Sequence, residues 1–295
     1  MRTRMTFKQR LHRFNITPVT IIVSLVLLFY CIVLIFPYIY AFFASINSIS
    51  SFDKTRFLAI PLSFKNIDFK NYAKAFDSLT TEGGATLFDM FLNSMWYSFG
   101  TTTIGLFFAT CCAYVCAKYK FPGRRFIYVF ALVMMMVPII GSQSSALAWN
   151  KLLHGYDTPL YALINAQTID GSFIIILALF KAVDWSYAES GFIDGCGHFR
   201  TFFQIMLPQI FSALVALFVT DFIARWADAD TSLIFFPNLP TLGTGLFYAY
   251  NTFAGTVRLP DYFAALIIVM LPSLILFLVF QNKIMDMQLT GGIKG

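Results

Sequence analysis

The chain has 295 residues, of which 58% are hydrophobic and only 12% are charged, and its formal net charge is +6. Soluble domains contain about 45–50% apolar and about 25% charged residues, so this composition excludes an ordinary soluble protein and predicts an integral membrane protein. The sequence contains no Arg-rich stripe and no recognisable nucleic-acid-binding module, which argues against a nucleic-acid partner.

The N-terminal 19 residues are basic and precede the first long apolar run. Residues 1–15 contain five Lys or Arg residues and no acidic residue. The run over residues 20–44 is long enough to cross a bilayer and too long for the apolar region of a signal peptide, and no A-x-A cleavage site follows it. We therefore predict a cytoplasmic N-terminus, residues 1–19, and a first transmembrane helix.

Five further apolar stretches predict an all-α membrane protein with six transmembrane helices. A helix needs about 20 apolar residues to span the hydrocarbon core. The predicted spans are 20–44, 91–117, 126–149, 160–182, 207–227 and 262–280, within a transmembrane domain of residues 20–282. A polar loop, residues 45–89, should hold a short helix around residues 72–76, and residues 283–295 form a C-terminal tail.

The third and fourth predicted spans contain residues that disturb a helix or weaken its apolar character. Pro138 should kink the third span. The first half of the fourth span contains Asn165, Gln167 and Asp170. Such polar side chains suit a wet cavity better than a lipid-facing surface.

The distribution of Lys and Arg predicts the orientation of the spans. The positive-inside rule assigns short loops rich in these residues to the cytoplasm. The loop of residues 118–125 holds two Lys and two Arg residues and follows the second span, on the same side as the basic N-terminus. We therefore expect both termini, and the polar segment of residues 184–208, to be cytoplasmic.

This 184–208 segment lies between two apolar runs and is predicted to form a short helix, a turn and a second short helix. Ser186 and Glu189 have the spacing of a capping box, and Gly195 and Gly197 interrupt the helix. The second helix is predicted to be amphipathic. Its predicted apolar face consists of Phe199, Phe202, Phe203 and Met206. A compact helix–turn–helix between two spans indicates a docking element.

The same segment resembles that of a known family. Residues 189–195, E-S-G-F-I-D-G, followed by Leu207-Pro208, resemble the cytoplasmic EAA loop of ABC importer permeases, whose pattern is E-A-A-x-x-D-G-A and then I-x-L-P. Small residues replace the three alanines of that pattern. Four other segments are similar to carbohydrate-uptake permeases of the maltose-G type: Asn93-Ser94, Ala113-Tyr114, Phe121-Pro122-Gly123-Arg124 and the tail Leu289–Gly295.

The resemblance implies a permease subunit of an ATP-driven ABC importer for a sugar or oligosaccharide, in a bacterial cell membrane. Its implied partners are a second permease subunit, two ATP-binding subunits and an extracytoplasmic solute-binding protein. The chain contains no G-x-x-x-x-G-K-[ST] stretch, so ATP is expected on the partner subunits.

The EAA-like loop is implied to couple the permease to the ATPase. Glu189 either contacts a basic group of the ATPase or only closes its own helix, and the sequence leaves both interpretations open. The residues expected to take part in coupling are Glu189, Ser190, Gly191, Asp194, Gly195 and Pro208.

Polar and aromatic residues within the predicted spans are candidates for the substrate pathway. Intramembrane ionisable groups are costly and often functional. Asp221 and Arg225, spaced i, i+4, could pair on one helix face, and such a pair could equally serve packing alone. The candidates are Asn165, Gln167, Asp170, Trp149, Asp221, Arg225 and Trp226.

No catalytic or metal-binding pattern is present in the sequence. It contains neither H-E-x-x-H nor G-x-S-x-G, and its five cysteines, without framework spacing, predict free thiols. We predict a transport subunit rather than an enzyme, with no cofactor and no metal of its own. The alternatives are a self-contained secondary transporter or channel, with Asp170, Asp221 and Arg225 as an ion relay, and an ABC permease for a non-sugar solute.

Overall fold

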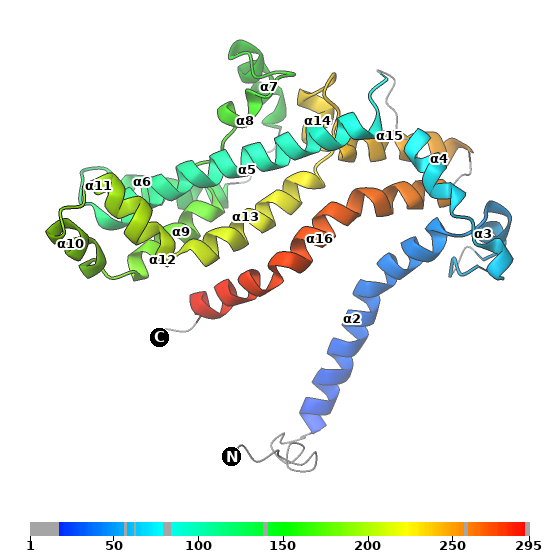
Figure 1. Cartoon of the computed structure of the whole chain (residues 1–295), viewed down its shortest axis with the longest axis horizontal. Helices are drawn as coiled ribbons and strands as arrows, with labels where there is room; N and C mark the ends of the chain where they lie inside the picture. Colours follow the sequence, from blue (N-terminus) through cyan, green and yellow to red (C-terminus); the bar gives the residue numbers. More distant parts are fainter. Residues whose placement is uncertain are drawn as a thin grey trace.

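The computed structural model, shown in Figure 1, describes residues 18–55, 58–61, 63–78, 84–137, 141–256 and 259–292. Helices joined by short connections account for these residues. Extended pairing among them is limited to one isolated bridge between Asn47 and Ile67. The prediction of an all-α protein is confirmed for this part of the chain.

The helices differ widely in length, and several short ones separate the long ones. In chain order they are α2 (Pro18–Ser45), α3 (Ile49–Thr55), the 3₁₀ turn η1 (Phe64–Asn66), α4 (Lys70–Ser78), α5 (Leu87–Lys118), α6 (Arg124–Met136), α7 (Gln143–Leu152), α8 (Tyr161–Ile164), α9 (Gly171–Ala182), α10 (Ser186–Ile193), α11 (His198–Arg200), the π-helical η2 (Thr201–Met206), α12 (Leu207–Gln209), α13 (Phe211–Trp226), α14 (Asp230–Phe235), α15 (Leu242–Thr256) and α16 (Leu259–Gly292).

Among the described residues, three helices, α2, α5 and α16, are long and apolar enough to cross a membrane. Two bent pairs raise this number to five if each pair is one span. One pair joins α9 to α10 at 68°, and the other joins residues 198–209 to α13 at 76°. The six predicted spans are therefore not six straight helices.

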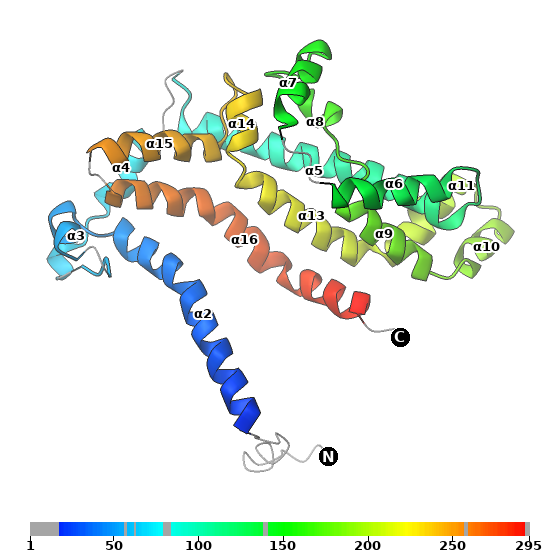
Figure 2. The same ribbon diagram turned by 180° about the vertical axis from the view of Figure 1, so that it is seen from behind.

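α5 runs through the centre of the molecule, and α9 and α13 pack along it, while α16 packs along α13 (Figures 1 and 2). The interface of α5 with α9 joins small to large side chains: Ala109 and Ala113 share a buried cluster with Phe173 and Phe180. Small residues let helix backbones approach closely, and this close packing drives helix association in lipid.

α2 diverges from the other helices. Only the C-terminal end of α2 meets α16, near the start of α16 (Figure 1). None of the apolar 18-residue window of α2 is buried inside the chain. Its buried residues are confined to Ala41, Ala44 and Ser45. The apolar window of this helix therefore presents a surface that lipid or another protein can contact.

The stretch predicted as the fourth span, residues 160–182, is not one helix, because α8 ends at Ile164 and α9 begins at Gly171. The Asp170 carboxylate accepts a hydrogen bond of 3.1 Å from the Phe173 N–H and caps α9. Side-chain oxygens that bond nearby backbone groups favour a helix start over a helix interior. The polar residues of this stretch thus end one helix and begin another.

The stretch predicted as the third span is also divided. α6 ends at Met136, and α7 begins at Gln143. With 13 residues, α6 is shorter than the about 20 residues that a span requires. Pro138, the predicted kink, lies outside the described residues. The short helix predicted around residues 72–76 corresponds to α4.

Candidate functional site

The 184–208 segment forms a hairpin of two short helical limbs at one end of the molecule, beside the loop that joins α5 to α6 (Figures 1 and 2). The first limb is α10. The second runs from α11 through η2 to α12. Gly195 lies in the turn with φ of +80°, a backbone conformation that suits glycine. The predicted helix–turn–helix is therefore present.

The start of α10 differs from the prediction. Ser186 is the first residue of the helix, and the Asp184 carboxylate accepts a hydrogen bond of 3.0 Å from its N–H. This bond lowers the pKa of the Asp184 carboxyl. The predicted capping box of Ser186 with Glu189 was wrong, because Asp184 satisfies the free donor from a position further upstream.

Glu189 lies exposed in the first turn of α10. No described residue forms a hydrogen bond or an ion pair with its carboxylate. The neighbouring Ser190 hydroxyl donates to the Tyr187 carbonyl, 2.9 Å away, within the same helix. Of these two side chains, Glu189 is thus the one directed to solvent without a local role.

Gly191 lets the two limbs of the hairpin pack closely. It is buried, and a Cβ at this position would require the tip of the Ile205 side chain of the second limb to move. Its carbonyl accepts a hydrogen bond of 2.9 Å from the Cys196 N–H, which closes the turn. Gly191 therefore leaves room for Ile205, and Gly195 makes the turn. Pro208 lies in the short helix α12, before the break at Ile210, and not in the first turn of the long helix α13.

The predicted apolar face of the second limb was wrong. Phe202 and Met206 are buried, whereas Phe199 is 84% exposed and Phe203 is 47% exposed. The π-helical bonds of residues 201–206 change the number of residues per turn, so 3.6-residue spacing does not identify one face. Gly197 is the residue that precedes α11, so no side chain caps the start of this limb.

Three contacts hold the hairpin and the residue before it on the helix bundle. The Tyr119 hydroxyl and His198 Nδ1 lie 3.0 Å apart, and the Lys118 amino group donates to the Val183 carbonyl. The Phe202 ring packs against Tyr114 of α5, with ring centroids 4.8 Å apart. The hairpin is therefore packed against α5 and continues into α9 on one side and α13 on the other.

A small polar cavity lies between α5, α9 and α13. It brings together four of the seven pathway candidates predicted from the sequence: Gln167, Asp170, Asp221 and Arg225. Its volume is about 10 Å³, close to the room that one water molecule needs. Thr101, Thr102 and Ser172 add hydroxyl groups to its wall. The sequence pattern thus identified a cluster that the fold assembles.

The predicted ion pair of Asp221 with Arg225 does not form among the described residues. The Asp221 carboxylate instead accepts a hydrogen bond of 3.2 Å from the Ser172 hydroxyl of α9. Thr102 contributes a buried hydroxyl without a hydrogen-bond partner in the described chain. Within this part of the chain, the cavity wall therefore keeps both a cation and a hydroxyl available for an occupant.

The other three candidates lie elsewhere. Asn165 exchanges side-chain hydrogen bonds of 2.7 and 3.2 Å with Asn150, which ties α8 to α7. Trp149 is 55% exposed on α7. Trp226 is buried, stacks on Phe222 with centroids 5.5 Å apart, and donates from Nε1 to the Val269 carbonyl at 3.0 Å.

Comparison with known families decides between the classes of transporter. Residues 101–286 match the model of the family described as the binding-protein-dependent transport system inner membrane component. The chain belongs to this family. As such an inner membrane component it is a multi-pass membrane protein and a transport subunit. The match includes the hairpin and the polar cavity.

Individual relatives of this inner membrane component are permeases. It is 26% identical to the arabinooligosaccharides transport system permease protein of Bacillus subtilis, over 78% of this chain and 83% of that protein. It is 24% identical to the diacetylchitobiose uptake system permease protein of Streptomyces coelicolor, over 88% and 83%. It is 28% identical to the maltodextrin transport system permease protein of Streptococcus pneumoniae, over 70% and 74%.

A solved structure shares the fold of this inner membrane component. It belongs to a bacterial ABC transporter involved in the import of the acidic polysaccharide alginate. The TM-score is 0.72 at 19% sequence identity, with 95% of this chain and 98% of that chain covered. The arrangement of bent helices in Figure 1 is therefore a fold found in ABC importers.

Sequence reasoning missed a second buried polar contact of the inner membrane component. Tyr97 is 1% exposed, and its hydroxyl donates to the Asp228 carboxylate at 2.8 Å. Asp228 also accepts from the Thr231 N–H, at 3.0 Å. These residues are far apart in sequence, so no local pattern points to the pair. The only signal is an acid directly after the apolar stretch of the fifth predicted span.

Proposed function

We propose that this chain is the permease subunit of an ATP-driven importer of a sugar or oligosaccharide and forms half of the translocation pathway. The observation that carries the proposal is the set of relatives named for arabinooligosaccharide, diacetylchitobiose and maltodextrin transport, together with the hairpin of residues 184–208. Membership of a binding-protein-dependent family favours this function over a self-contained secondary transporter or channel.

The proposed complex contains a second permease subunit, two ATP-binding subunits and an extracytoplasmic solute-binding protein, in a bacterial plasma membrane. Both termini and the hairpin face the cytoplasm, as the excess of Lys and Arg on that side favours. ATP is bound by the partner subunits. This chain contributes no cofactor and no catalytic residue.

The hairpin is the proposed contact with the ATPase. Ile193 is 86% exposed and Phe199 is 84% exposed at its outer surface, and the Glu189 carboxylate has no partner within the described chain. Exposed apolar side chains next to an unpaired charge are typical of a protein interface. The apolar pair would fill a cleft on the ATPase, and Glu189 would bind a basic group there.

Coupling then follows from the rigid connections of the hairpin. A partner shifts a conformational equilibrium only through contacts that differ between the two states. ATP binding moves the cleft, and the bends at both ends of the hairpin pass that movement to α9 and α13. Asp170 caps the first of these helices, and the second carries Asp221 and Arg225, so movement of the hairpin changes the cavity.

The cavity between α5, α9 and α13 is the proposed part of the substrate pathway that this chain contributes. Hydroxyl, amide and charged groups line it, and these groups bind sugar hydroxyls. At about 10 Å³ it is too small for a sugar ring, so the pathway is closed at this point and must widen during transport.

Reconstitution tests the proposal. The chain, its partner permease and the ATP-binding subunits are placed in vesicles with the solute-binding protein, and uptake of oligosaccharides is measured. Uptake should require both ATP and the binding protein. Uptake by vesicles that hold this chain alone and an ion gradient would reject the proposal in favour of a secondary transporter.

Replacing Asp221 by asparagine should lower the sugar transported per ATP hydrolysed about tenfold, because a hydrogen bond to a charged group is worth about 1.5–3 kcal/mol and a neutral one about 1 kcal/mol. The measurement compares uptake and phosphate release in the same vesicles. Asp228→Asn is the matched control, since this acid is bound to Tyr97 and lies outside the cavity. Equal losses in both variants would contradict a pathway role for Asp221.

A further inference from the structure

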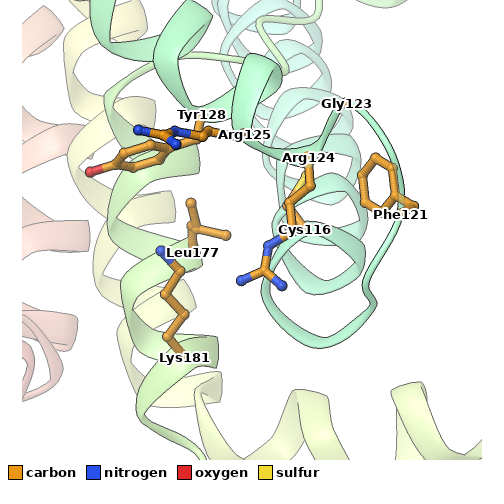
Figure 3. A pocket seen from close by; sticks show the side chains of 8 residues that line it. All are labelled: Cys116, Phe121, Gly123, Arg124, Arg125, Tyr128, Leu177 and Lys181. Atoms are coloured by element: carbon orange, nitrogen blue, oxygen red, sulfur yellow. The ribbon is translucent and has the colours of Figure 1, made fainter.

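A second, larger cavity lies on the bundle at the start of α6, at the same end of the molecule as the hairpin (Figures 1 and 3). Its volume is about 420 Å³, within the range of about 300–1,000 Å³ that ligand pockets occupy. The ends of α5 and α9 and the first turns of α6 surround it. Neither the coupling hairpin nor the polar cavity uses these residues.

Three cations gather on its wall. Arg124 and Arg125 begin α6, and Lys181 lies in the last turn of α9. Figure 3 shows the guanidinium group of Arg124 and the amino group of Lys181 pointing toward the same space. The lining contains no acidic residue, and no side chain in the described chain forms a hydrogen bond or an ion pair with these three groups. A recess lined by one sign of charge attracts the opposite charge.

The rest of the wall is apolar. Cys116 is 3% exposed and Leu177 is 2% exposed, and the centre of the Tyr128 ring lies 4.9 Å from the Lys181 amino group. The outer surface of α6 continues this character, since Phe126 is 72% exposed. An occupant of this cavity would have its anionic part near the cations and an apolar part against the wall and α6.

We propose that this cavity binds the phosphate group of an anionic membrane phospholipid, with Arg124 and Lys181 as its main charged contacts. A guanidinium group binds two phosphate oxygens at once, and an ammonium group adds a compact charge. This end of the bundle faces the cytoplasm in the orientation given under the proposed function, on which this step rests, and basic recesses between membrane helices on that side suit anionic head groups. Free phosphate offers the same anion but would leave the apolar wall uncovered, so the lipid is the favoured source.

The test measures lipid retention by the full-length chain. The protein is placed in nanodiscs of phosphatidylcholine and phosphatidylglycerol in equal parts and released for native mass spectrometry. The wild type should retain phosphatidylglycerol in preference to phosphatidylcholine. Lys181→Gln and Arg124→Gln should each weaken that retention about tenfold, the effect of losing one charged hydrogen bond.

Lys120→Gln is the matched control, because it removes one charge from the same end of the molecule outside this cavity. It should leave retention unchanged. Equal loss in all three variants would overturn the proposal and indicate a general charge effect. If the wild type retained phosphatidylglycerol and phosphatidylcholine equally, this result alone would overturn the proposal. Displacement of phosphatidylglycerol by inorganic phosphate would reject the lipid as the source.

Discussion

Replacing Glu189 by glutamine is expected to lower the transport-coupled ATPase activity of the assembled importer about tenfold, while the complex still assembles. A hydrogen bond to a charged group at an interface is worth about 1.5–3 kcal/mol, and each 1.4 kcal/mol corresponds to about a tenfold change. Glutamine keeps the size and the helix propensity of glutamate and removes only the charge. ATP hydrolysis in vesicles, with and without the loaded binding protein, measures the effect.

The capping of α10 separates the two possible functions of Glu189. The alternative function, closing its own helix, belongs to Asp184, whose carboxylate accepts from the Ser186 N–H. Within the described chain, Glu189 can stabilise α10 only through its position in the first turn. The interaction of its charge with the helix dipole contributes about 0.3–1 kcal/mol. A loss well beyond that value requires a partner outside the chain.

Asp230→Asn is the matched control for this variant. Asp230 is also an acid in the first turn of a short helix, α14, it is exposed, and its carboxylate has no hydrogen-bond partner among the described residues. The Asp230→Asn variant loses the same interaction between a carboxylate and a helix dipole, and this residue does not lie on the hairpin. Unchanged coupling in Glu189→Gln, or an equal loss in Asp230→Asn, would show that the Glu189 charge is not used at the ATPase.

The sequence predicts correctly those helices that consist of one long, uninterrupted apolar run. α2, α5 and α16 follow from long apolar runs, because lipid selects length and hydropathy directly. The breaks are set by other forces. The chain bends at Ile210, with φ of −110° and ψ of 7°. Pro208, two residues earlier, is a local signal for a break, but it does not give the angle of the bend. No sequence pattern predicts the π-helical turn of residues 201–206 before this bend.

The part of the candidate site that the sequence could predict is the part contributed by residues at i, i+4 spacing on one helix. Asp221 and Arg225, four residues apart on α13, both line the polar cavity. Trp226 is adjacent to Arg225, and successive residues on an α-helix point about 100° apart, so its side chain faces α16 instead. Tyr97 and Asp228 meet only through the tertiary fold, which one sequence does not reveal.

Replacing Trp226 by alanine is expected to lower the free energy of unfolding by about 3–5 kcal/mol, the cost of removing a large buried aromatic side chain. The indole lies 2% exposed among α5, α13 and α16, and it contacts Phe91, Phe222 and the Val269 carbonyl. Unfolding in mixed micelles with increasing denaturing detergent measures the change. Trp226→Phe should lose less, because it keeps one aromatic ring in the buried space and gives up the pyrrole part of the indole and one hydrogen bond, worth about 1 kcal/mol.

Trp149→Ala is the matched control, since the Trp149 side chain is 55% exposed on α7 and an exposed substitution changes stability by about 0.5 kcal/mol or less. The sequence predicts both tryptophans as candidates for sugar contacts, and their burial separates them. If Trp226→Ala left stability unchanged and lowered the sugar transported per ATP, Trp226 would belong to the pathway. A large loss of stability in Trp226→Ala, with none in Trp149→Ala, would leave Trp149 as the aromatic residue free to contact sugar.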